Sequence, residues 1–182
     1  VKIRAIVTRP EHSFHGFTRA MDQINHYLGI KTITSLATGL LIALLLWAIG
    51  VDFPFIWGLI AFLMNFIPNV GSFIAAIPAM IMAFVRLGGF GVLWTGVIFL
   101  AVNMVIGNIV EPKIMGDGLG LSTLVVIMSL VFWGYLLGTT GMFLSIPLTL
   151  AAKIAFESSP STRWIAVLLG TENDAFELMS EN

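Results

Sequence analysis

Asn65, Pro68, Asn69 and Gly71 interrupt an apolar stretch with groups that could bind a polar solute. The two asparagine amides offer hydrogen-bond donors and acceptors. Pro68 lacks a backbone N–H and disfavours helix before it, so it should free carbonyls of the preceding turn. Beyond the break, the first amides of the next helix should form a positive end. Two interpretations stay open: a solute-binding break, or asparagines that only satisfy the freed backbone.

A second polar group follows at Asn108 and Glu111, whose spacing of three places both on one helix face. Glu111 is either a titratable group that couples transport to an ion gradient or a surface partner of Lys113, and its position favours the second. No other pattern suggests catalysis. The chain has three histidines without further ligands, no cysteine and no phosphate-binding loop. We therefore expect no enzyme activity, no metal site and no cofactor.

The composition predicts an integral membrane protein. Hydrophobic residues make up 58% of the chain and charged residues 10%, whereas soluble domains have about half and a quarter. The stretches 32–51, 53–85, 87–110 and 118–152 contain no Asp, Glu, Lys or Arg. A membrane-spanning helix needs about 20 such residues, so the second and fourth stretches are too long for one span. The formal net charge of -1 argues against a nucleic-acid partner.

Breakers inside the two long stretches predict two helical hairpins. The first should have arms at 55–67 and 72–85, with a serine cap at Ser72, and the second arms at 121–137 and 142–156. Arms of the first hairpin would be about 20 Å long, against a hydrocarbon core of about 30 Å, so we expect broken or re-entrant hairpins. Thr139, Thr140 and Gly141 in the second turn join the expected solute pathway. Three further prolines are expected to kink helices: Pro78, Pro112 and Pro147.

The sequence predicts four segments. We also expect earlier helices to precede Val1. Ser35 and Gly39 in the first spanning helix should let another helix approach closely. A short helix is expected at 164–169. The segments are 1–31, an N-terminal segment with an amphipathic interfacial helix; 32–87, a spanning helix and the first hairpin; 88–156, a spanning helix after a turn at 88–91 and the second hairpin; and 157–182, a cytoplasmic C-terminal tail.

The two span-plus-hairpin segments predict an inverted repeat. The run "GSFIAAIP" from Gly71 resembles "GMFLSIP" from Gly141, about seventy positions later. Each segment crosses a bilayer an odd number of times, so the second would lie upside down relative to the first. The predicted fold class is an all-α, polytopic membrane protein with two broken or re-entrant hairpins, a build typical of secondary transporters. With Lys31 in the cytoplasm, only Arg86 among the basic residues lies outside, which agrees with the positive-inside rule.

Three longer motifs resemble the autoinducer-2 exporter family of bacterial, permease-like membrane proteins: "NFIPNVGSFIAAIP", "GNIVEPKIMGDGLGLSTLVV" and "WGYLLGTTGMFLSIPLTL". The resemblance runs from about residue 14 to residue 170. The family's Asn-x-Ile-Pro-x-x-Gly element falls on Asn65 to Gly71, its Glu-Pro-Lys-Ile-Met-Gly element on Glu111 to Gly116, and its Pro-Leu element on Pro147 and Leu148.

The resemblance implies a C-terminal part of a multi-pass protein of the bacterial inner membrane. The implied activity is export of the small polar signal autoinducer-2 by alternating access, with H+ or Na+ as the coupling ion. It also implies a homo-oligomer, for which a pentamer stays open. Many relatives have a His-Pro pair where Ser122 and Thr123 stand here, which leaves ion coupling undecided. Sodium(lithium)/proton antiport and a non-transporting scaffold are the alternatives.

Overall fold

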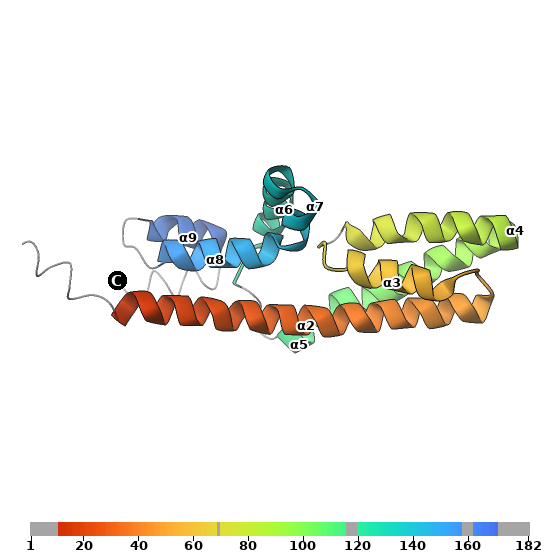
Figure 1. The fold of residues 1–182 in the computed structure, drawn as a ribbon, viewed down its shortest axis with the longest axis horizontal. Coiled ribbons are helices and arrows are strands. Elements are labelled where there is room, and N and C mark those ends of the chain that lie inside the picture. The colour runs from red at the N-terminus through yellow and green to blue at the C-terminus, as the bar shows by residue number, and fades with distance from the viewer. Residues whose placement is uncertain (1–10, 69, 116–119, 158–161, 171–182) are drawn as a thin grey trace, which may run out of the picture. The chain divides into compact units, whose positions relative to one another are not determined.

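The computed structural model describes residues 11–68, 70–115, 120–157 and 162–170. Every regular element in these ranges is helical, which confirms the all-α prediction (Figure 1). The contacts divide the chain into an α2–α5 unit, residues 29–116, and an α6–α9 unit, residues 1–28 with 117–182. The elements are α2 (Glu11–Ile49), α3 (Pro54–Met64), α4 (Gly71–Val105), the π-helix η1 (Ile106–Val110), α5 (Glu111–Met115), α6 (Thr123–Leu137), α7 (Thr139–Phe143), α8 (Ser145–Glu157) and α9 (Arg163–Leu169).

Helix α2 is continuous where the sequence predicts a surface helix and a separate spanning helix that meet at Lys31. The stretch contains no proline, and its isolated Gly29 is tolerated within a helix, so nothing local ends the helix there. In the part of the chain that the structure describes, two helical segments are long and apolar enough to cross a membrane, Met21–Ile49 and Gly71–Met115. Length and composition therefore agree with the predicted membrane protein.

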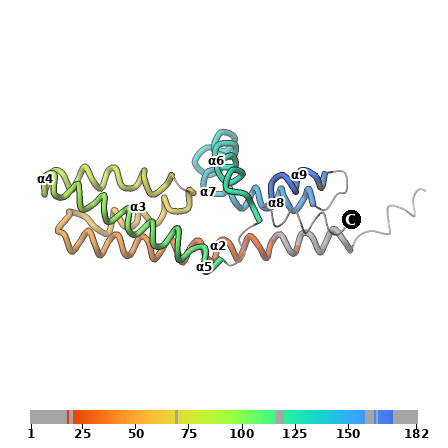
Figure 2. The backbone as a smooth tube through the Cα atoms, turned by 180° about the vertical axis from the view of Figure 1, so that it is seen from behind, coloured from red at the N-terminus to blue at the C-terminus, as the bar shows by residue number. Residues whose placement is uncertain are grey.

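Helix α4 bends at Gly88, which has φ 65° and ψ -153° (Figure 2). A Cβ atom on Gly96 would lie 3.5 Å from Met80 Cε, so the arms before and after Gly88 pack against each other. A Cβ atom on Gly91 would lie 2.6 Å from the Ala83 carbonyl oxygen, which only glycine permits. The turn predicted at 88–91 is therefore confirmed, although Gly88 is its one non-helical residue. Helical structure resumes directly after Gly88, because glycine at position 91 can pack against the Ala83 carbonyl.

Small residues hold the α2–α5 unit together. Ala75, Ala79 and Ala83, at successive turns of α4, are all 0% exposed and share one core with Ile42 and Leu46 of α2. Helices in lipid have no hydrophobic driving force between them, so small residues that allow close packing stabilise such contacts.

The close helix approach predicted at Gly39 is also confirmed. A Cβ atom there would lie 2.6 Å from the Gly58 carbonyl oxygen of α3 and 2.8 Å from Phe62 Cβ. Gly58 meets Gly39 in the same way, since a Cβ atom on Gly58 would lie 2.5 Å from the Gly39 carbonyl oxygen. This pair of glycines therefore sets how α2 and α3 pack.

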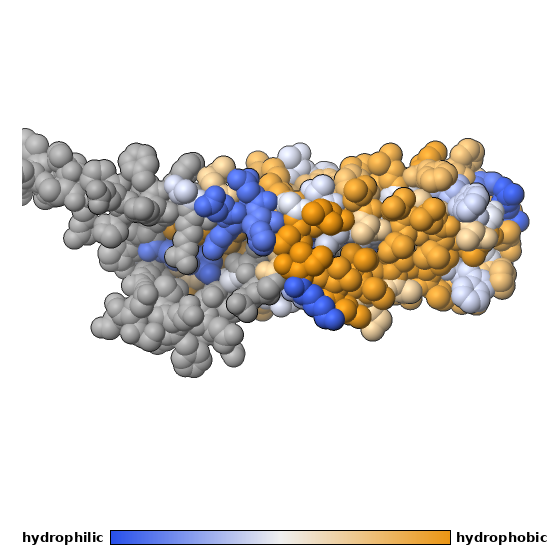
Figure 3. Space-filling view, turned by 90° about the horizontal axis from the view of Figure 1, so that it is seen from below, coloured by the Kyte–Doolittle hydropathy of each residue, from blue (hydrophilic) through white to orange (hydrophobic). Residues whose placement is uncertain are grey.

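The outer surface of the α2–α5 unit is apolar, and ion pairs lie near both ends of its α2 segment. Figure 3 shows one face as almost continuous apolar surface with hydrophilic residues toward its ends. Lys31 pairs with Glu111 at one end of the segment, and Asp52, just beyond the other end, pairs with Arg86. The helix from Lys31 to Ile49 is about 27 Å long, close to the hydrocarbon thickness of about 30 Å. Exposed apolar residues between these ends include Ile33, Leu36, Leu40, Trp47, Ile77, Ile81, Phe84 and Leu100.

In the α6–α9 unit the predicted second break is present at Gly138, which has φ 64° and ψ -147°. A Cβ atom on Gly141 would overlap the Trp133 carbonyl oxygen. Pro147 explains the later break at Leu144, because its missing N–H cannot bond the Phe143 carbonyl and its ring crowds that group. Trp133 Nε1 donates to Thr149 Oγ1 at 3.0 Å, which joins α6 to α8. The short helix predicted at 164–169 is confirmed as α9.

The backbone at Gly138 matches that at Gly88, fifty positions earlier, in both dihedral angles. Gly141 and Gly91 also match, since each packs against the carbonyl eight residues before it. The break before Gly71 has no positive-φ residue among its described positions. The local structure therefore pairs the second break with the Gly88 bend, whereas the sequence comparison pairs it with the Gly71 run. The inverted repeat itself stays a prediction.

Candidate functional site

The break between α3 and α4 uses its own backbone groups. The Ile67 N–H donates to the Met64 carbonyl at 2.9 Å, and the Gly71 N–H to the Ile67 carbonyl at 3.2 Å. The Val70 N–H donates to the Pro68 carbonyl at 2.7 Å. The Val70 and Gly71 amides, which we expected at the positive end of the next helix, thus donate to carbonyls within the tight turn. A Cβ atom on Gly71 would overlap the Met64 carbonyl oxygen, so the turn requires glycine there.

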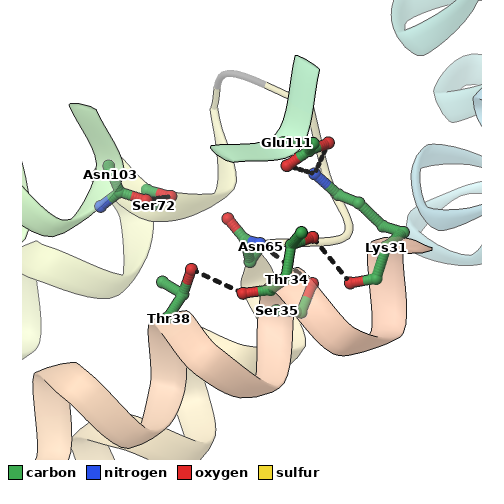
Figure 4. A network of polar contacts seen from close by, with 8 residues as sticks. All are labelled: Lys31, Thr34, Ser35, Thr38, Asn65, Ser72, Asn103 and Glu111. Carbon is green, nitrogen blue, oxygen red and sulfur yellow. Dashed lines mark hydrogen bonds and ion pairs between the residues drawn. The ribbon is translucent and has the colours of Figure 1, made fainter. Parts of the chain in front are cut away.

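Among the described residues of this break, Asn65 has a side-chain acceptor that is not used by another residue. Its Nδ2 donates to Ser35 Oγ of α2 at 2.9 Å, and its Oδ1 has no partner within the described part of the chain. Figure 4 shows the Asn65 side chain between the Lys31–Glu111 pair and the Ser72–Asn103 pair. Pro68 is half-buried beside it, and Asn69 lies outside the described residues. Asn65 therefore supplies an acceptor that a solute could occupy.

Glu111 bonds Lys31, eighty positions away, rather than its neighbour Lys113. Lys31 Nζ donates to Glu111 Oε1 at 2.8 Å and to Oε2 at 3.0 Å. The two side chains are 8% and 15% exposed, whereas Lys113 is exposed. The expected surface pairing with Lys113 was wrong, because the fold brings the α2 lysine to the buried side of the carboxylate.

Ser72 and Asn103 form a second polar pair, across the two arms of α4. Ser72 Oγ donates to Asn103 Oδ1 at 2.6 Å, and Asn103 Nδ2 donates to the Phe99 carbonyl at 2.7 Å. The predicted serine cap was wrong, because α4 begins at Gly71 without a side-chain cap. Asn108, expected beside Glu111, lies within η1 with its side chain exposed.

A polar stripe on α2 completes the network and was missed in the sequence. Thr34, Ser35 and Thr38 are each at most 1% exposed. Thr34 Oγ1 donates to the Lys31 carbonyl at 3.2 Å and Thr38 Oγ1 to the Thr34 carbonyl at 2.9 Å. Polar residues at spacings of three and four within an apolar span predict one buried polar face, and that signal could have revealed the stripe.

The remaining residues expected in the pathway or at kinks lie outside the polar network. Thr139 and Thr140 are exposed at the second break, and Gly141 is buried there, all in the α6–α9 unit. Pro78 lies inside the first arm of α4. Pro112 is exposed in the first turn of α5, and Pro147 is buried near the start of α8. The network described above therefore contains Asn65 and Glu111 from the expected pathway and adds residues of α2 and α4.

The geometry suits a small polar solute that is held by hydrogen bonds. Within one apolar unit, the network offers a carboxamide acceptor, hydroxyl groups and an ion pair that neutralises its own charge. Such groups are costly in a membrane interior and mark pathways or binding sites there. Lys31 and Glu111, which pair with each other, are the charged residues among the eight of this network.

Comparison with known proteins identifies the family of the chain. The model of the AI-2E family transporters matches residues 2–161. The chain is 48% identical over 172 residues to the AI-2 transport protein TqsA of Escherichia coli (strain K12), which covers 94% of this chain and 50% of TqsA. It is 54% identical over 157 residues to a protein of Haemophilus influenzae named as a candidate transport protein, covering 86% of this chain and 45% of that protein.

The chain thus spans about half the length of the curated relatives it matches. The sequence resemblance to the exporter family is confirmed, and the matched family is one of transporters rather than of enzymes. The chain belongs to the AI-2E family of transporters.

Proposed function

We propose that the protein exports a small polar metabolite across the bacterial inner membrane by alternating access, and that the solute is autoinducer-2. The name of TqsA, AI-2 transport protein, supports the choice of substrate. The observation that carries the proposal is the polar network inside the apolar α2–α5 unit, where the Asn65 Oδ1 acceptor lies between two polar pairs and is not bonded to any described residue. A solute that crosses beside Asn65 would exchange its hydration for these groups.

The proposed orientation follows from charge. Lys31, with Glu111, lies at the cytoplasmic end of the α2–α5 unit, and Arg86, with Asp52, lies at the outer end. The same assignment puts the C-terminus in the cytoplasm. The helix breaks then lie within or at the edge of the bilayer, where irregular backbone persists only when protein or water surrounds it. A homo-oligomer would supply such surroundings for the exposed apolar surfaces.

Cation/proton antiport at Glu111 is the competing function. An antiporter needs this carboxylate to exchange its ion during turnover, yet both of its oxygens accept hydrogen bonds from Lys31. The pair therefore supports a structural role for Glu111 in the state described. We propose that a gradient of H+ or Na+ drives export. Flux measured in the Glu111→Gln variant tests whether Glu111 takes part in binding that ion.

The experiment is flux of labelled autoinducer-2 in proteoliposomes of the full-length protein, with and without pH and sodium gradients. We expect Asn65→Ala to lower flux about tenfold, the equivalent of one lost hydrogen bond in the pathway. Leu40→Ala on the exposed apolar face is the control and should transport like the wild type. If Asn65→Ala lowers stability but not flux, the scaffold interpretation replaces the pathway. If the wild type exchanges ions but does not carry the solute, and Glu111→Gln abolishes the ion exchange, the protein is an antiporter instead.

A further inference from the structure

The π-helix η1 directly precedes Glu111 and determines where its carboxylate points. The Glu111 N–H donates to the carbonyl of Ile106, five residues earlier, which is the hydrogen bond that defines a π-turn. Ile106 is 7% exposed and belongs to the core of the α2–α5 unit. In a regular α-helix, the residue five positions after Ile106 would point about 140° away from it. The π-turn instead brings Glu111 beneath Ile106, on the buried side where Lys31 bonds it.

The π-turn and the ion pair stabilise each other, whereas α-helical bonding opposes both. π-helices are rare, and single π-turns within α-helices are often found at functional sites. Here the burial of Ile106 and the two hydrogen bonds from Lys31 to Glu111 favour the π form. Gly107 lies inside the turn, and a Cβ atom there would meet nothing within 4 Å. Packing therefore does not require this glycine, and its low helix propensity makes the segment easy to rearrange.

We propose that η1 is a positioning switch for Glu111. In its π form it aims the carboxylate at Lys31, and in an α form it turns the carboxylate away and opens the contact between α2 and the end of the second arm of α4. The inference deepens the proposed function, on which its role in transport rests, by naming the movement that gives a solute access to Asn65.

The positioning step can be tested by changing the length of η1. Deleting Gly107 places Glu111 four residues after Ile106, so a plain α-helix would keep both on one face. Inserting one alanine after Gly107 places Glu111 six residues after Ile106, off that face. Double-mutant cycles of Lys31→Met with Glu111→Gln, measured by thermal unfolding in detergent, report the coupling between the two side chains.

We expect the coupling to survive the Gly107 deletion and to vanish in the insertion variant. Gly107→Ala keeps the length, fits the open space and should retain the coupling. The exchanged pair Lys31→Glu with Glu111→Lys serves as a second probe if a single substitution prevents folding. Loss of the coupling on deletion, or its survival on insertion, would overturn the positioning role of the π-turn.

The switching step can be tested by hydrogen exchange, which does not depend on transport. In the wild type, amides 107–111 should exchange faster than amides 99–105 of α4, because the π-turn opens locally. The Gly107 deletion should slow exchange at 107–111 about tenfold, since one α-helix replaces two competing forms, and should also lower flux. Wild-type exchange or wild-type flux in the deletion variant would overturn the switch. Absence of any flux in the wild type would instead remove the proposed function, and the exchange and coupling results would still decide the switch.

Discussion

At the scale of single residues, the Lys31–Glu111 pair shows what an amino-acid sequence can and cannot indicate. Glu111 stands out because it is an acid that adjoins an apolar span. Its partner could not be chosen from sequence, because Lys113 is a near neighbour while Lys31 lies eighty positions away. The choice depends on how α2 packs and on the π-turn that aims the carboxylate, and neither has a local sequence signal. Thr34, Ser35 and Thr38, by contrast, had one in their helical spacing.

Removing one partner of this pair should destabilise the protein more than removing both. We expect Glu111→Gln to lower the free energy of unfolding by about 3 kcal/mol, because it leaves the Lys31 ammonium buried without its counter-charge. The double variant Lys31→Met with Glu111→Gln should recover part of that loss. Thermal or denaturant unfolding in detergent gives the comparison. A double variant that is less stable than both single variants would show that the two side chains act independently.

At the scale of elements, the breaks could be predicted because glycine and proline act locally. The positions of the interruptions near residues 68, 88 and 138 follow from Pro68, Gly88 and Gly138 together with the glycines beside them. Two features could not be predicted. The continuity of α2 through Lys31 and the π-turn before Glu111 are set by packing and by tertiary contacts rather than by local preferences.

Glycines that contact backbone should be far less replaceable than glycines in open space. Gly71→Ala should destabilise the protein strongly, because the new methyl group would overlap the Met64 carbonyl oxygen and force the α3–α4 turn apart. Gly89→Ala is the matched control, because nothing lies within 4 Å of its Cβ position. Melting temperatures of the two variants in the same detergent decide the point, and equal values would mean that the turn is not packed as described.

At the scale of the whole molecule, charge and length suggest how the α2–α5 unit crosses the bilayer. The α2 segment from Lys31 to Ile49, which has an ion pair near each end, is about 27 Å long, close to the hydrocarbon thickness of about 30 Å. The basic residues in the sequence predicted this orientation, but they could not give the number of crossings. The 11-residue α3 and the longer first arm of α4 divide one apolar stretch unequally.

The orientation can be tested with single cysteines, because the chain has none of its own. We expect Gly89→Cys to react with an impermeant thiol reagent added outside intact cells, and Lys113→Cys to react only after the membrane is permeabilised. Both positions are exposed, so access to the reagent depends on the side of the membrane. The opposite pattern would invert the unit and with it the proposed direction of the pathway.

The most direct test of the pathway is labelling of Asn65→Cys in membranes by a small hydrophilic thiol reagent, with and without autoinducer-2. Leu40→Cys, on the exposed apolar face of α2, is the control and should stay unreactive in lipid. If a solute passes beside the network, Asn65→Cys should react and autoinducer-2 should slow the reaction. An Asn65→Cys variant as unreactive as Leu40→Cys, or one that reacts equally fast with the solute present, would contradict a pathway at this site.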